Sequence, residues 1–385
     1  MNPPSAMRNL PATPRILVRG TNWLGDAVMT TPALLRLREK FPEAHITLLT
    51  PEKLNDLWLA APKQGEGGLN HPAVDETIAF ASGESVFSVA NKLRRGKFDL
   101  ALVLPNSPRS AIETWLAGIP QRIGYARPWR NCLLTQTIPP RTDAVNMRKR
   151  SEAAIRQLVS VKLETGNRKP EIPKSAHQIF EYLHLTAALG ANPEPLAPHL
   201  FVSADEIEAA KKKFGLEKIG GPIFGLNPGA EYGPAKRWPV EKFIAAAQEI
   251  QRQTNCVWIL FGGKGDLKAS AQIASVIRAS RLTSGKTSLR ELMSGLKVCR
   301  VLLTNDTGPM HVAAALGMPV VVPFGSTSPE LTGPGLPGDP RHRLLKSDAP
   351  CSPCFLRECP IDFRCMNGIT VERVVEAVLS CSGAL

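Results

Sequence analysis

Residues 305–311 read NDTGPMH and bring an aspartate, a threonine, a glycine and a histidine into one short turn. The turn follows an apolar run at 301–304 and precedes an Ala-rich run, and a second apolar run covers 319–324. This pattern predicts a strand, a helix and a second strand. The start of such a helix presents unpaired N–H groups and a positive dipole end, which favour a phosphate. From this segment alone, a phosphate site and a plain helix start capped by Thr307 are equally supported.

A second polar loop, residues 227–239, also follows a predicted strand and reads NPGAEYGPAKRWP. It combines Gly229, where the backbone can approach a ligand closely, with the cations Lys236 and Arg237. The carboxyl ends of parallel strands meet at one edge of a sheet. We therefore expect this loop and the turn at 305–311 to form a diphosphate cradle rather than a long surface turn.

Two aspartates end Gly-containing loops that follow other predicted strands. Asp266 ends FGGKGD (261–266), where it either accepts a hydrogen bond from a ribose or sugar hydroxyl or caps the next helix. Asp26 ends GTNWLGD (20–26), just before a helix predicted over 27–41. The glycines before Asp26 match neither a dinucleotide fingerprint nor a P-loop. By position alone, Asp26 is an acid that interacts with the helix dipole.

Strands and helices alternate along both halves of the chain, which predicts an α/β protein with doubly wound, mostly parallel sheets. A chain of 385 residues exceeds what one core usually supports, so we expect two Rossmann-like domains. The predicted divisions are a flexible segment 1–14, an N-terminal domain 15–190, a linker 191–198 and a C-terminal domain 199–385. The predicted strands cover 15–19, 45–50, 74–79, 98–104, 222–226, 256–261, 301–304 and 319–324, and the predicted helices include 51–60, 85–95, 176–189, 204–214 and 240–253.

The formal charge of +13 favours an anionic partner, which is a phosphorylated ligand, a membrane surface or nucleic acid. Basic residues gather between 141 and 174, either as a solvated face or as a patch for an anionic surface. This stretch has no aromatic residue to stack on bases, which disfavours nucleic acid. The N-terminus lacks the apolar core of a secretory signal and no segment reaches bilayer length, so we expect a cytoplasmic protein with reduced cysteines.

Two observations concern metals. The four cysteines near the C-terminus either bind a structural zinc ion or remain thiols, because the spacing after the first pair is not that of a standard zinc knuckle. They are Cys351, Cys354, Cys359 and Cys365. No two aspartates lie two residues apart, so the Asp-x-Asp element of metal-dependent sugar transferases is missing. Fixed cations and a helix dipole would then have to stabilise a leaving phosphate.

Four motifs in order, GTNWLGDAVMTTPAL, PGAEYGPAKRWP, FGGKGD and NDTGPMHVAAALGMPVVVPFGSTSPE, resemble those of the bacterial lipopolysaccharide heptosyltransferases of glycosyltransferase family 9, closest to the heptosyltransferase II type. The resemblance spans nearly the whole chain. It implies a GT-B fold with two facing Rossmann-like domains, the acceptor on the N-terminal one and ADP-heptose on the C-terminal one.

The implied reaction moves L-glycero-D-manno-heptose from ADP-heptose to the first heptose of a lipid A–Kdo inner core. It inverts the anomeric carbon, needs no metal cofactor, and takes place at the cytoplasmic face of the inner membrane, which the enzyme contacts peripherally. The alternatives are a family 9 transferase for another acceptor, such as the heptosyltransferase I type, and a GT-B sugar-nucleotide epimerase. A non-catalytic carbohydrate-binding or membrane-binding protein is a further alternative.

The resemblance also assigns roles to individual residues. Asp26 matches the general base that takes the proton of the acceptor hydroxyl, and Lys236 matches the lysine that binds the donor phosphates. Trp23 and Arg19 either contact the acceptor or pack in the core. The donor-binding turn corresponds to Asp306, Thr307, Gly308 and His311.

Overall fold

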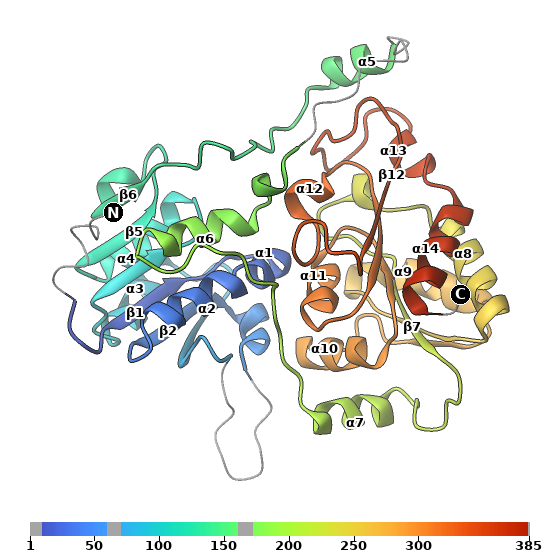
Figure 1. The fold of residues 1–385 in the computed structure, drawn as a ribbon, viewed down its shortest axis with the longest axis horizontal. Coiled ribbons are helices and arrows are strands. Elements are labelled where there is room, and N and C mark those ends of the chain that lie inside the picture. Colours follow the sequence, from blue (N-terminus) through green and yellow to red (C-terminus); the bar gives the residue numbers. More distant parts are fainter. Residues whose placement is uncertain (1–9, 60–70, 161–171, 384–385) are drawn as a thin grey trace. The chain divides into compact units, whose positions relative to one another are not determined.

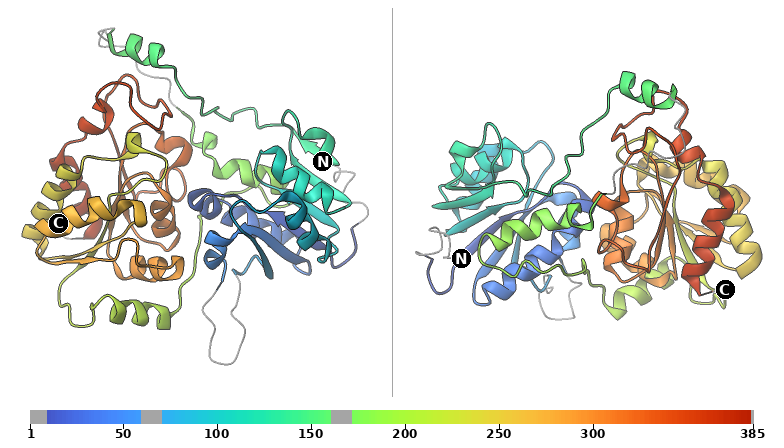
Figure 2. Two further views of the ribbon diagram at one scale, coloured as in Figure 1. Left: turned by 180° about the vertical axis from the view of Figure 1, so that it is seen from behind. Right: turned by 45° about the horizontal axis from the view of Figure 1, so that its top comes forward.

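Contacts divide the chain into two compact units, each built on one parallel sheet (Figure 1). The computed structural model describes residues 10–59, 71–160 and 172–383. Among these, the first unit comprises the chain up to Ala144 with Gln178–Phe201, and the second comprises Val145–His177 and the chain from Val202. Helices cover both faces of each sheet (Figures 1 and 2), which confirms the predicted α/β architecture.

The first unit holds a six-stranded sheet of order β3-β2-β1-β4-β5-β6 in its described residues. Its strands are β1 (Arg15–Arg19), β2 (His45–Pro51), β3 (Glu76–Phe80), β4 (Leu100–Val103), β5 (Gln121–Tyr125) and β6 (Gln136–Ile138). Its helices are α1 (Leu24–Met29), α2 (Thr31–Lys40), η2 (Glu52–Leu57), α3 (Val86–Arg94), α4 (Pro108–Leu116), η3 (Asn131–Leu133) and α6 (Ile179–Ala187). The fully buried strand β4 and the largely buried β1 form the centre of the core.

The second unit repeats this plan with a described sheet of order β12-β11-β10-β7-β8-β9. Its strands are β7 (Ile223–Asn227), β8 (Val257–Leu260), β9 (Ser280–Leu282), β10 (Leu302–Thr304), β11 (Val320–Phe324) and β12 (Arg343–Lys346). Its helices are α5 (Glu152–Ser160), η4 (Lys174–Ala176), α7 (Ala204–Lys213), η5 (Pro234–Lys236), α8 (Val240–Thr254), η6 (Lys264–Asp266), α9 (Leu267–Val276), α10 (Leu289–Val298), α11 (Gly308–Ala315), α12 (Pro329–Thr332), α13 (Arg364–Asn367) and α14 (Val371–Ser382).

In each sheet the order of the strands reverses between two neighbours at the centre. The first sheet extends from β1 through β2 to β3 on one side and from β4 to β6 on the other, and β7 and β10 play the same parts in the second. Loops at the carboxyl ends of such a strand pair run in opposite directions and leave room for a ligand. The loop before Asp26 follows β1, and the two loops of the predicted diphosphate cradle follow β7 and β10. All three loops therefore lie at such positions.

Several elements differ from the sequence-based expectations. The predicted helix over 27–41 is two helices, α1 and α2, because the chain turns at Thr30. The predicted helix over 51–60 is the 3-10 helix η2. Four strands, β5, β6, β9 and β12, were not predicted. Each is short or only partly buried, so its apolar pattern is weak.

The contacts also group the chain differently from the predicted domain boundaries. Residues 145–177, which the prediction places in the N-terminal domain, belong to the second unit, where Ile155 of α5 is buried in its core. The predicted linker 191–198 packs with the first unit. The physical reason is that a stretch with few apolar residues is placed by a small number of distant contacts. An example is the bond from Arg150 Nε to Pro353 O, 2.9 Å long.

The basic stretch is only partly free to bind a surface. Arg141 pairs with Asp143 and Arg156 pairs with Glu152. Arg148 and Lys149 are exposed. Lys162, Arg168 and Lys169 lie outside the described residues, as does most of the predicted N-terminal segment. Among the described residues, no helix is both long enough and apolar enough to span a bilayer.

Candidate active site

The two loops of the predicted diphosphate cradle start side by side at the carboxyl edge of the second sheet (Figure 1). Asn227 at the end of β7 is in register with Thr304 at the end of β10, and its Nδ2 donates to Thr304 Oγ1 over 3.0 Å. Asn305 then joins the loops, since its Oδ1 accepts from the backbone N–H of Trp238 (2.9 Å) and its Nδ2 donates to Pro228 O (2.7 Å). Asn305 is fully buried. The loops are therefore one connected structure.

Lys236 and Asp306 form an ion pair across these loops. Lys236 Nζ lies 2.7 Å from Asp306 Oδ2, and the two side chains are 14% and 4% exposed. Thr327 Oγ1 donates to the same carboxylate oxygen. Lys236 Nζ also lies 5.0 Å from the centre of the Tyr232 ring, a cation–π distance. These two contacts fix the ammonium group at the carboxyl edge of the sheet.

Helix α11 begins directly beside this pair. Thr307 occupies the N-cap position, but within the described structure its side chain makes no capping hydrogen bond. The alternative in which Thr307 only caps the helix therefore lacks its characteristic bond. The first-turn N–H groups of α11 can donate to a bound anion instead.

His311, one turn into α11, is buried and electrically neutral near pH 7. Burial lowers the pKa of its imidazole to about 4, against the opposing attraction of the Asp306 carboxylate. His177, on the segment before α6, adds to this lowering. His177 is itself buried, which lowers its pKa to about 4, and its Nε2 lies 3.0 Å from Gly333 O. Neither histidine contributes a positive charge to the site.

Gly229 and Asp266 are in direct contact, which connects the third loop to the cradle. A Cβ atom at position 229 would lie 2.2 Å from Asp266 Cγ, so only glycine fits there. Asp266 Oδ2 accepts from the backbone N–H of Gly263 over 2.9 Å. This bond lies within the turn of η6, and at the start of α9 the Asp266 side chain makes no capping hydrogen bond in the described structure. The predicted cap of the next helix is therefore wrong, and contact with a ribose or sugar hydroxyl stays a prediction. The Asp266 carboxylate also lies 3.8 Å from Arg237.

In the first unit, Asp26 stands in the first turn of α1, as predicted. Its side chain is partly buried, and Oδ1 accepts from Gln178 Nε2 over 3.3 Å. Trp23, at the N-cap of α1, is 51% exposed, and Lys53 Nζ lies 5.3 Å from its ring centre. Trp23 therefore does not pack in the core and is available for contact with a ligand.

Arg19 behaves in the opposite way. It is 1% exposed, and its Nε donates to Glu113 Oε2 over 2.9 Å in a fully buried ion pair. Its Nη1 donates to Gly20 O and to Asn22 Oδ1. Of the two readings for Arg19, core packing is correct. Through its bonds to Gly20 and Asn22, Arg19 stabilises the loop before α1.

Comparison with known proteins identifies the group to which this structure belongs. The sequence model of glycosyltransferase family 9 (heptosyltransferase) matches residues 144–363, which is more than half of the chain. The chain belongs to glycosyltransferase family 9.

The family 9 chain is 30% identical to lipooligosaccharide heptosyltransferase 2 of Haemophilus ducreyi over 336 residues, 83% of this chain and 86% of the relative. It is 29% identical to lipopolysaccharide heptosyltransferase 2 of Escherichia coli over 83% of this chain and 85% of that one. The solved structure of the E. coli ADP-heptose lipopolysaccharide heptosyltransferase II superposes with a TM-score of 0.72 at 27% identity. That match covers 96% of this chain and 98% of the other. The protein is thus a glycosyltransferase with the GT-B fold.

The four C-terminal cysteines of this family 9 chain form no disulfide. All eight cysteines lie within the described ranges and are free. Across those ranges, His, Cys, Asp and Glu side chains form no group of three or more that could hold a metal. Burial raises the pKa of the Cys365 thiol to about 12, so it is protonated near pH 7. The predicted zinc site therefore gains no support from the described side chains.

Several residues that support the candidate residues within each unit were not predicted from the sequence. They are Asn305, Thr327, His177, Gln178 and Glu113. Asn305 had a usable signal, because a polar residue directly after a buried strand at a topological switch point stands at the ligand edge. The others carry no local signal, since each acts through a partner far away in sequence.

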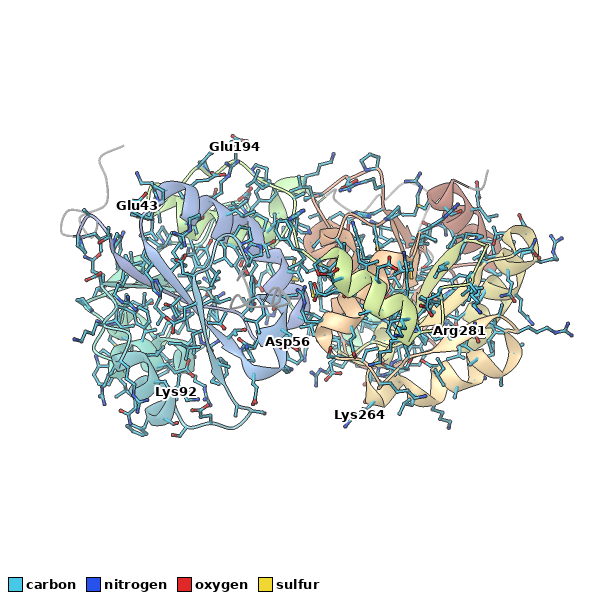
Figure 3. All side chains as sticks on the ribbon, turned by 90° about the horizontal axis from the view of Figure 1, so that it is seen from below. Glu43, Asp56, Lys92, Glu194, Lys264 and Arg281 are labelled. Carbon is cyan, nitrogen blue, oxygen red and sulfur yellow. The ribbon has the colours of Figure 1, made fainter. Side chains whose placement is uncertain are left out.

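The buried pair Arg19–Glu113 yields a prediction about stability. We expect Glu113→Ala to lower the free energy of unfolding by about 3–5 kcal/mol, because the Arg19 charge stays buried without its partner. Urea unfolding followed by circular dichroism measures this. Glu43→Ala, at an exposed surface position (Figure 3), is the matched control and should change little.

A double variant, Arg19→Met with Glu113→Leu, removes both charges and should recover most of the lost stability. If Glu113→Ala were as stable as the Glu43→Ala control, the ion pair would not support the loop before α1.

Proposed function

We propose that this family 9 enzyme transfers L-glycero-D-manno-heptose from ADP-heptose to the first heptose of the lipopolysaccharide inner core, lipid A–Kdo–heptose. The observation that carries the proposal is the Lys236–Asp306 pair beside the start of α11. The heptosyltransferase names of the similar E. coli and H. ducreyi proteins support the choice of sugar and acceptor.

On this proposal the diphosphate of ADP-heptose lies against Lys236 and the first-turn N–H groups of α11. As the bond from the anomeric carbon to the phosphate oxygen breaks, negative charge grows on that oxygen. A fixed ammonium and a helix start stabilise this charge without having to reorganise during the reaction. Asp306 and Thr327 hold the ammonium in position. Leaving-group stabilisation by these fixed groups is the basis for proposing a metal-independent reaction.

Asp26 is the proposed general base. Its carboxylate takes the proton from the acceptor hydroxyl while that oxygen attacks the anomeric carbon, and ADP leaves from the opposite side. A single in-line displacement inverts the configuration, so ADP-β-heptose yields an α-linked product. Trp23, exposed three residues before Asp26, is proposed to contact the acceptor sugar.

We also propose that the enzyme works as a peripheral protein at the cytoplasmic face of the inner membrane. Arg148 and Lys149 are exposed, and the neighbouring Val145 and Met147 are 38% and 39% exposed. Cations interspersed with apolar side chains suit an anionic lipid surface, where each cation contributes about 1 kcal/mol. No nucleic-acid partner is proposed.

An assay with two defined acceptors tests the function. The enzyme is incubated with ADP-heptose and with lipid A–Kdo acceptors that carry either one heptose or none, and products are identified by mass and by release of ADP. We expect a one-heptose gain with the heptose-bearing acceptor and little with the other. NMR of the product should show an α linkage.

Each other result has a distinct meaning. Preference for the acceptor without heptose would replace the proposed acceptor by that of the heptosyltransferase I type. Conversion of the nucleotide sugar without any acceptor would indicate an epimerase. Neither ADP release nor transfer would overturn the catalytic proposal and leave a binding protein. A β-linked product would refute inversion.

A further inference from the structure

Gln178 connects the proposed base to the interior of the first unit. Its side-chain nitrogen, Nε2, donates to Asp26 Oδ1 over 3.3 Å and to the hydroxyl oxygen of Tyr182 over 2.8 Å. Gln178 and Tyr182 are four residues apart at the start of α6, so they share one face of the helix. Asp26 is 152 residues away in sequence. The three side chains form a short chain of hydrogen bonds.

Tyr182, at the buried end of these hydrogen bonds, has a fixed position. Tyr182 is 5% exposed and belongs to the buried face of α6. Burial raises the pKa of its phenol well above the usual value, and the nearby Asp26 carboxylate raises it further. The phenol therefore remains protonated and does not compete with Asp26 for a proton. It gives the Gln178 amide a fixed anchor.

An amide N–H directed at a carboxylate has two effects. It restricts rotation of the carboxylate plane, which matters because proton abstraction requires hydrogen-bond reach to the substrate hydroxyl. It also favours the charged form of the carboxylate over the neutral form. Both effects keep an aspartate ready to act as a base.

We propose that Gln178 is the positioning residue for Asp26, and that Tyr182 in turn fixes the Gln178 amide. This inference rests on the proposed function, in which Asp26 accepts the acceptor's proton. Gln178 does not touch the reacting atoms and acts through Asp26.

Three variants test the proposal. We expect Gln178→Ala to lower kcat by about 10- to 100-fold, because the base loses its fixed orientation. Without the amide donor, the acid limb of the pH profile of kcat/KM should move to higher pH. Gln178→Glu should move that limb further, since a second carboxylate disfavours ionisation of Asp26. Tyr182→Phe keeps the ring in the core and should cause a smaller change in the same direction.

Controls separate positioning from general damage. The KM for ADP-heptose should stay the same in all three variants, because the donor residues lie in the other unit. Gln272→Ala, at an exposed position of α9, should match the wild type. A purely structural role would lower thermal stability without moving the pH profile, and that result in both Gln178→Glu and Tyr182→Phe would overturn the proposal.

Unchanged kcat and pH profile in Gln178→Ala would also overturn it. The proposed function fails by other results: the wild type shows no heptose transfer, or Asp26→Asn keeps full activity. If Asp26→Asn were inactive and Gln178→Ala fully active, the positioning role of Gln178 would be refuted and the proposed function would stand.

Discussion

Replacing Asp26 with asparagine should lower kcat for heptose transfer by about 10²–10⁴-fold, the usual contribution of a general base. The asparagine side chain keeps the size and can still bond to Gln178, so the fold and the position of α1 should be preserved. It cannot accept a proton from the acceptor hydroxyl. The attacking oxygen then has to lose its proton to water, which is poorly placed and weakly basic.

Binding of ADP-heptose should be unchanged, because the proposed donor residues belong to the second unit. Steady-state assays give kcat, and calorimetric titration with ADP gives donor affinity. Asp56→Asn, another carboxylate of the first unit (Figure 3), is the matched control and should retain activity. Transfer by Asp26→Asn at nearly the wild-type rate would show that the base is a different residue.

The second large effect is expected at Lys236. We expect Lys236→Met to lower kcat/KM for ADP-heptose by about 10²–10³-fold, since the leaving diphosphate loses a preorganised cation. The same change leaves the Asp306 carboxylate, 4% exposed, without its partner 2.7 Å away. A buried charge without its partner costs about 3–5 kcal/mol of stability. Activity and stability should therefore fall together.

A double variant separates these two losses. Lys236→Met with Asp306→Asn removes both charges, so most of the stability should return while the activity does not. Lys268→Met, at an exposed position of α9, is the control for removal of a lysine. If the double variant regained activity along with stability, Lys236 would serve only the fold, and the diphosphate would have to be stabilised elsewhere.

Elements whose contacts are local in sequence could be predicted, and elements placed by distant contacts could not. The turn at 305–311 could be placed between a strand and a helix because its neighbours in sequence are its neighbours in space. The central strands were found because they are buried on both faces and read as continuous apolar runs. The edge strands β9 and β12 are only partly buried, and their mixed composition hid them.

The sequence alone determined the α/β class, the central strands, the loops at their carboxyl ends and the family resemblance. It singled out Asp26, Lys236 and Asp306 before any contact was known. The strands and loops follow from residue types within short segments, where the periodicity of apolar residues is informative. The role of Asp26 as a base came from the family resemblance and not from its local pattern.

Only the tertiary structure decided which distant side chains meet. It paired Lys236 with Asp306 and Arg19 with Glu113, set Asp266 against Gly229, and brought Gln178 to Asp26. It also placed residues 145–177 in the second unit. The reason is that strand order and the packing of helices on the sheet bring these residues together, and the spacing of residues along one segment carries no information about either.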